Sequence, residues 1–184
     1  MSPQRIMFIR HAEKPAPSMG AGIDEDGKPD EESLSVRGWQ RAGALTQFFR
    51  SGDAAQREKM TPGCIFAAGS GPGSKSNRSM QTVAPLVRQL QESAHIKYSS
   101  SYLKDDGEAL MHEVLAETGV ILIAWEHKIL PSLIGLLPNA PTVPSAWPEH
   151  RFDMVWIVER EGEGWRFSQH PQLLLAGDSA EPIK

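Results

Sequence analysis

The chain has 184 residues, enough to bury the core of one domain, and its 40% apolar and 23% charged residues are typical of a globular protein. Its formal net charge of −4 at pH 7 excludes recruitment of nucleic acid or an anionic membrane by an overall positive field. Any bound anion must therefore meet a local cluster of basic side chains. The single cysteine, Cys64, excludes an intramolecular disulfide, and we interpret it as a small buried apolar residue.

No apolar stretch approaches the ~20 residues that a membrane helix needs. The first residues also lack the apolar region of a signal peptide. The sequence therefore predicts one domain over residues 1–184, a cytoplasmic location, and neither nucleic acid nor a membrane as partner. It carries no signal for the oligomeric state.

The first half of the chain alternates between predicted strands and helices. Residues 4–9 include a continuous apolar run, which indicates a strand buried on both faces. Residues 16–33 are rich in Gly, Pro, Asp and Glu and predict a mobile loop that controls access to any nearby site. Ser35 is expected to cap a helix that runs to about residue 50, and residues 64–68 predict a second strand.

The second half continues this alternation after a Gly/Ser loop at residues 69–77. The expected elements, in order, are a helix at 79–91, a strand at 96–100, a helix at 108–118 closed by Gly119, a strand at 120–125, a helix at 127–137, and two strands at 152–160 and 164–169 joined by a turn. The last dozen residues are expected to be irregular.

Alternating strands and helices predict an α/β fold, a three-layer sandwich with a mostly parallel central sheet. In such sheets, ligands bind beyond the carboxyl ends of the strands. The ends of the predicted strands are therefore the places to look for chemistry.

Basic residues and histidines follow three of these strands. Arg10 and His11 follow the first, Arg78 follows the loop after the second, and His127 follows the strand at 120–125. Each of them alone has a simpler explanation, such as a polar residue leaving the sheet or a surface ion pair. Together they predict that two imidazoles and two guanidiniums converge on one pocket.

Phosphate is the ligand that this combination favours. The planar guanidinium of arginine binds phosphate oxygens in pairs, and backbone N–H groups of the Gly/Ser loop can assist. A neutral histidine can attack phosphorus, while a second one stabilises the transition state. The alternative is a zinc site formed by His11, His127 and Glu126, which is less favoured because two guanidiniums would repel the metal ion.

Several segments resemble the signature of the histidine phosphatase superfamily, whose members share the phosphoglycerate mutase-like fold. These segments are RHAEKP (10–15), LSVRGWQRA (34–42), SNRSMQTVAPL (76–86) and ILIAWEHKILP (121–131). The segment FDMVW (152–156) is similar to a strand of the branch that carries a Trp-Glu-His version of the last motif. The resemblance spans residues 5–158.

The resemblance implies that His11 is the nucleophile that accepts the phosphoryl group. It implies that Arg10 and Arg78 bind the phosphate and that His127 is the second histidine of the pocket. Lys14 is expected to contact the substrate at the rim. The resemblance implies no metal and no organic cofactor, and a phosphorylated small molecule or phosphoprotein as partner.

A general acid must protonate the leaving oxygen, and four carboxylates are candidates. We favour Glu108 because many relatives carry a carboxylate after the third strand. Asp105, Asp106 and Glu126 remain open, and Glu108 is equally well explained as an acidic residue in the first turn of a helix.

Other charged residues are expected around the same pocket. Glu13 belongs to the first motif and is expected only to line the rim. Lys75 and Lys128 add local positive charge, and Ser70 and Ser74 are possible phosphate contacts or simple loop residues.

The sequence thus predicts a metal-independent phosphomonoester hydrolase that acts through phosphohistidine. The alternatives are a non-catalytic module that binds or senses a phospho-ligand, and a phosphatase of phosphohistidine or phosphoserine proteins. Phosphotransfer of the mutase type is less favoured, because 184 residues leave little room for segments that enclose a reorienting intermediate.

Overall fold

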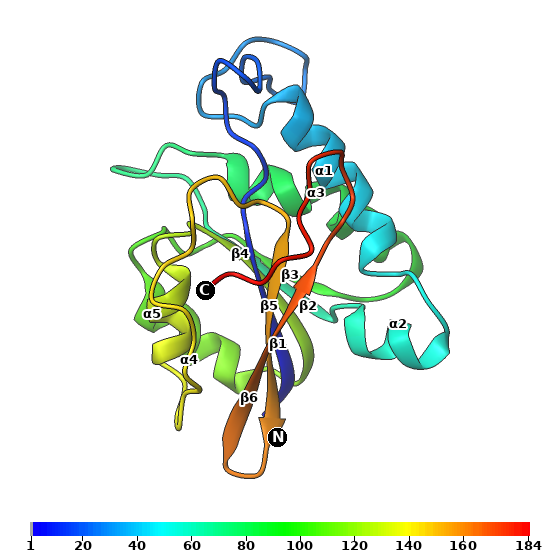
Figure 1. Cartoon of the computed structure of the whole chain (residues 1–184), viewed down its shortest axis with the longest axis vertical. Coiled ribbons are helices and arrows are strands. Elements are labelled where there is room, and N and C mark those ends of the chain that lie inside the picture. Colours follow the sequence, from blue (N-terminus) through cyan, green and yellow to red (C-terminus); the bar gives the residue numbers. More distant parts are fainter. Residues whose placement is uncertain (1) are drawn as a thin grey trace.

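A six-stranded sheet forms the middle layer of the computed structural model, which describes residues 2–184 (Figure 1). Its strands are β1 (Pro3–Arg10), β2 (Cys64–Ala67), β3 (Lys97–Ser99), β4 (Gly119–Trp125), β5 (Met154–Glu161) and β6 (Gly164–Pro171). Their spatial order is β3-β2-β4-β1-β5-β6. The first four of these are parallel, whereas β5 runs antiparallel to β1 and β6 antiparallel to β5. The predicted α/β fold with a mostly parallel sheet is confirmed.

The helices cover both faces of the sheet. They are α1 (Val36–Phe48), α2 (Ala54–Met60), α3 (Arg78–Ser93), α4 (Gly107–Ala116) and α5 (Leu130–Gly135). One apolar cluster joins the sheet to α4 and α5, and a second joins it to α1 and α3. The three predicted layers are therefore helices, sheet and helices. None of the helices in residues 2–184 is both long and apolar enough to span a membrane.

The central strand β1 explains why its apolar run is continuous. Ile6 and Phe8 belong to the cluster with α4 and α5, while Met7 and Ile9 belong to the cluster with α1 and α3. All four side chains are completely buried. Successive residues of a strand face opposite sides, so a strand covered on both faces needs apolar residues at every position.

Helix α1 begins where it was predicted, because Ser35 caps it by accepting a hydrogen bond from the backbone N–H of Gly38 at 3.1 Å. A Cβ atom on Gly38 would lie 2.5 Å from the carbonyl oxygen of Glu13. The glycine thus allows the start of α1 to approach the segment that follows β1.

Three local predictions differ from the structure. Helix α2 was not predicted, because none of its residues is buried and its start depends on a capping box between Asp53 and Gln56. Gly119 does not close α4, whose C-cap is Glu117; it begins β4 with a positive φ of 75°. The last helix, α5, starts only at Leu130, with Pro131 in its first turn.

The segment 16–33 forms neither a helix nor a strand in the described chain, as predicted. It carries isolated backbone bridges such as Ile23 with Pro29, and the carbonyl of Ile23 accepts a 2.7 Å hydrogen bond from the indole of Trp39. Its backbone is therefore attached to α1, while its mobility stays a prediction.

Candidate active site

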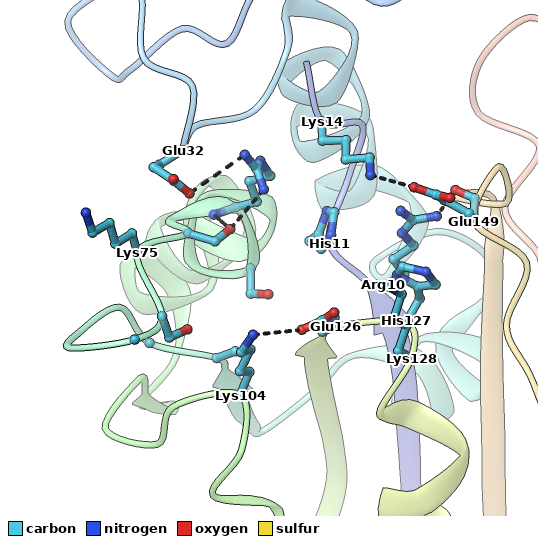
Figure 2. Close-up of a pocket in the computed structure, with 17 residues that line it drawn as sticks. Arg10, His11, Lys14, Glu32, Lys75, Lys104, Glu126, His127, Lys128 and Glu149 are labelled. Atoms are coloured by element: carbon cyan, nitrogen blue, oxygen red, sulfur yellow. Dashed lines mark hydrogen bonds and ion pairs between the residues drawn. The ribbon is translucent and has the colours of Figure 1, made fainter. Parts of the chain in front are cut away.

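A pocket lies at the edge of the sheet where three parallel strands end together. Arg10 at the end of β1 is opposite Trp125 at the end of β4, and Ala67 at the end of β2 is opposite Ala124. The residues that follow these strands consequently leave the sheet side by side. They enclose a cavity of about 470 Å³ together with the Gly/Ser loop and the start of α3 (Figure 2).

Five of the predicted site residues line this cavity. They are Arg10, His11, Lys14, Arg78 and His127, which come from the end of β1, the segment after it, α3 and the segment after β4. Figure 2 shows Arg10, His11, Lys14 and His127 around one space, although the two histidines are far apart in the sequence. The spatial convergence expected from the strand ends is therefore present.

His11 is held as a neutral imidazole. The residue is 8% exposed, and its Nδ1 lies 2.8 Å from the carbonyl oxygen of Ala12. Because a carbonyl can only accept, Nδ1 carries the proton and Nε2 keeps its lone pair. Burial, and next the positive charge of Arg10, lowers the pKa of His11 to about 3. At neutral pH the ring is therefore a nucleophile and not a cation.

Residues of α3 hold the segment around His11 in place. The backbone N–H of Ala12 donates to the hydroxyl of Thr82 at 2.8 Å. The side chain of Gln81 accepts from the N–H of Leu34 at 2.9 Å and donates to the hydroxyl of Ser33 at 2.8 Å. The Gln-Thr pair of the third motif thus connects α3 to the nucleophile segment and to the end of the loop.

Arg10 is buried with part of its guanidinium unused. Its Nη1 donates to the carbonyl oxygen of Glu149, and its guanidinium lies 3.8 Å from the centre of the Phe152 ring. Nε and Nη2 are buried and have no hydrogen-bond partner in the described residues. Burial lowers the pKa of Arg10 to about 10, so it remains charged at neutral pH. Buried donors without partners are costly, which indicates that an external acceptor binds here.

His127 provides a further buried nitrogen in the same cavity. The residue is 6% exposed, and its Nδ1 has no hydrogen-bond partner in the described residues. Burial, followed by the charge of Arg10, lowers the pKa of His127 to about 4. A neutral His127 can donate one N–H to an oxyanion.

Arg78 is oriented by the end of the loop 16–33. Its Nε donates to the carbonyl of Ser33 at 3.2 Å, and its Nη2 donates to the carbonyl of Glu31. The carboxylate of Glu32 lies 3.9 Å from Nη2. Burial lowers the pKa of Arg78 from its usual value. As the first residue of α3, it also lies where the helix dipole favours an anion.

Of the four candidate acids, only Glu126 lines the cavity in the described chain. In the view of Figure 2 it lies between His11 and Lys104, and its Oε2 is 3.9 Å from Nζ of Lys104. Glu108, the favoured candidate, lies with Asp105 in a separate depression beside α5. Asp106 precedes α4, and its carboxylate accepts from the N–H of Leu103 at 2.8 Å. The structure thus places the favoured acid outside the pocket.

Glu13 does not line the rim as expected. It is 1% exposed and forms a buried ion pair with Arg41, whose Nη2 lies 2.8 Å from Oε1 of Glu13. Arg41 also contacts Asp178 at 2.7 Å. The carboxylate of the first motif therefore binds a structural cation and is directed away from the substrate space.

Three charged pocket residues were not found from the sequence. Glu32 comes from the end of the loop 16–33, Lys104 from the segment after β3, and Glu149 from the segment before β5. Lys14 pairs with Glu149 at 2.7 Å. None of the three follows a strand directly, so strand ends give no signal for them.

The donor set of the zinc alternative is not assembled. In residues 2–184, no group of three or more His, Cys, Asp or Glu side chains lies close enough together to bind a metal ion. Cys64, for its part, is 3% exposed, and burial raises the pKa of its thiol to about 12.

No protein-family model and no curated protein matches the chain by sequence. Among solved structures, a protein from Nakamurella multipartitia named for the phosphohistidine phosphatase SixA is similar, with a TM-score of 0.53 and 17% identity, and the match covers 93% of this chain and 97% of that one. A SixA-named protein from Agrobacterium tumefaciens matches with a TM-score of 0.49 and 19% identity over 91% of this chain and 97% of that one. The first likeness confirms the predicted fold, a phosphoglycerate mutase-like α/β sandwich.

Proposed function

We propose that the protein is a metal-independent phosphomonoester hydrolase that forms a covalent phosphohistidine on His11. One observation carries this proposal: a buried neutral His11 with a free Nε2 shares its cavity with buried, unpartnered nitrogens of Arg10 and His127. A nucleophile and oxyanion donors in one pocket suit phosphoryl transfer. Lys14 at the rim belongs to the proposed substrate site.

In the first step, Nε2 of His11 attacks phosphorus, and the bond from phosphorus to the ester oxygen breaks. The leaving oxygen keeps the electron pair and needs a proton. Arg10 and Arg78 balance the charge of the phosphoryl oxygens, and His127 donates one N–H to them.

In the second step, a water molecule attacks the phosphorus of phospho-His11. The bond from phosphorus to Nε2 breaks, the ring regains its lone pair, and inorganic phosphate leaves. We assign the proton transfers to Glu126, which gives a proton to the leaving oxygen in the first step and takes one from water in the second. Its place on the cavity wall supports this role over Glu108.

A phosphohistidine protein is the second candidate substrate. It is the substrate class in the name of the Nakamurella protein, and its hydrolysis would use the same attack by His11. The leaving group is then an imidazole nitrogen and not an ester oxygen. We further propose a single domain and a cytoplasmic location, as predicted from the sequence.

The test is a screen of phosphomonoesters and of a phosphohistidine peptide with the wild type and His11→Ala, each with and without a chelator. We expect activity that is insensitive to the chelator, absent in His11→Ala and unchanged in the control His112→Ala, which alters an exposed histidine of α4. Quenching during turnover should trap an acid-labile phosphoryl group on His11. Activity that returns only with added metal would contradict the mechanism, and phosphate binding without any turnover would identify a binding module.

A further inference from the structure

The cavity is larger than the phosphoryl site that it contains. Its volume of about 470 Å³ lies within the range of pockets that enclose an entire small ligand. Arg10, His11 and His127 occupy one part of it (Figure 2). The remaining space must therefore accommodate the group to which the phosphate is attached.

The cavity is also more basic than a single phosphate requires. The basic side chains that line it are Arg10, Lys14, Lys75, Arg78, Lys104 and Lys128. Only three acidic side chains, those of Glu32, Glu126 and Glu149, line it in the described chain. This excess of cations occurs in a chain whose formal net charge is −4, so it is local to the pocket.

Three of these lysines, Lys75, Lys104 and Lys128, have no close ion pair in the described residues. Lys14 is paired with Glu149 at 2.7 Å, whereas Lys104 has only a loose contact of 3.9 Å with Glu126. Lys75 forms no ion pair within the described residues. Figure 2 shows Lys75 and Lys104 on the side of the pocket opposite Arg10.

The same side of the pocket offers uncharged donors. Lys75 belongs to the Gly/Ser loop, where Ser74 and Ser76 also line the cavity, and Ser74 is 9% exposed. Hydroxyl and ammonium groups together suit a carboxylate or a phosphate.

We infer that the substrate is a small phosphorylated acid, whose second anionic group, a carboxylate or another phosphate, binds between Lys75 and Lys104. This inference rests on the proposed function for the position of the scissile phosphate. Glu126, which we propose as the proton donor, lies on the wall of the same cavity.

Binding of inert phosphonates tests the second site without turnover. The matched ligands are 3-phosphonopropionate and propylphosphonate, which differ by a carboxylate in place of a methyl group, and the longer pair 4-phosphonobutyrate and butylphosphonate. Isothermal titration calorimetry should give at least about tenfold tighter binding of the carboxylated member of one pair to the wild type.

Lysine variants test whether Lys75 and Lys104 cause the preference for the carboxylated ligand. The double variant Lys75→Ala/Lys104→Ala should bind both members of a pair with nearly equal affinity. Lys59→Ala, which removes an exposed charge of α2 outside the pocket, should keep the wild-type preference. Thermal unfolding curves of each variant confirm that the fold is intact.

Equal affinity of the wild type for both members of both pairs would overturn the inference, as would an absence of phosphonate binding. A preference that Lys59→Ala also abolishes would show an effect of overall charge and overturn it too. Faster hydrolysis of a neutral phosphoserine peptide than of any small phosphorylated acid would do the same. By contrast, a carboxylate preference in binding without turnover of the corresponding phosphate esters would contradict only the proposed function.

Discussion

Arg10 and Arg41 are both buried arginines, but their surroundings differ. Arg10 is 1% exposed and Arg41 is 2% exposed. Each nitrogen of the Arg41 guanidinium donates to a side-chain oxygen, with Glu13 and Asp178 as the charged partners. Arg10 uses only Nη1, on backbone carbonyls, and leaves Nε and Nη2 without partners in the described chain.

The pKa shifts of the two arginines run in opposite directions. Burial alone would lower the pKa of Arg41, but its hydrogen bonds to Asp178 and Glu13 raise it overall. Burial lowers the pKa of Arg10, and the opposing charges around it are too weak to reverse this. A buried cation with internal counter-charges contributes to the fold, whereas one without them is free to bind an external anion.

The largest expected effect of this difference is on stability. Arg41→Gln leaves the carboxylates of Glu13 and Asp178 buried without their cation, so we expect the free energy of unfolding to fall by about 3–5 kcal/mol. Urea unfolding measured by circular dichroism checks this value. The control is Arg88→Gln on the exposed surface of α3, which should change stability little. A loss of unfolding free energy as small as that of the control would contradict the structural role of Arg41.

The corresponding change at Arg10 should affect activity. Arg10→Gln removes one preorganised donor from the phosphoryl site, so we expect kcat to fall by about 10²–10³-fold. Stability should change much less than in Arg41→Gln, because no internal carboxylate loses its partner. Steady-state kinetics and urea unfolding of the two variants together measure this contrast. An equal loss of unfolding free energy in Arg10→Gln and Arg41→Gln would contradict the difference between the two arginines.

Phosphate binding provides a third test of the free guanidinium of Arg10. Inorganic phosphate at 100 times its dissociation constant should stabilise the wild type by about 2.7 kcal/mol, because it binds only the folded chain. Arg10→Gln should lose most of this stabilisation, while the chosen control, Arg88→Gln, should retain it. Thermal unfolding with and without phosphate provides the measurement. An equal shift in Arg10→Gln would mean that phosphate binds elsewhere.

The pH dependence of stability tests the neutral state of His11. Its pKa in the folded chain, about 3, is below the ordinary 6.5, so the unfolded chain binds more protons between these values. The contribution of the neutral His11 to the free energy of unfolding is therefore fully present above about pH 6.5 and is lost as the pH falls toward 3. In His11→Asn, the slope between pH 6 and 4 should decrease by up to about 1.4 kcal/mol per pH unit.

This measurement uses urea unfolding in buffers without phosphate. The pKa of His127 is also lowered, to about 4. His11→Asn should therefore reduce the slope of stability against pH without abolishing it. Identical slopes in the wild type and His11→Asn would show that His11 titrates normally in the folded protein.

Local sequence signals account for most of the fold and for the centre of the site. Residues 6–9 are apolar at every position because β1 is covered on both faces, and Ser35 marks the start of α1 because a cap acts within one turn. Arg10, His11 and His127 could be assigned to one pocket because parallel strands end at the same edge of the sheet. Periodicity, capping and strand ends are all properties of neighbouring residues.

Long-range packing decided the partners of these groups. Glu13 follows His11 by two residues, yet it pairs with Arg41, which in turn binds Asp178 near the end of the chain. Glu126 lines the pocket and Glu108 does not, because this depends on how α4 and α5 pack against the sheet. The sequence does not distinguish a carboxylate that pairs with a guanidinium from one that transfers a proton or one that is hydrated. Only the folded chain, which sets the distance, burial and charge around each group, distinguishes these roles.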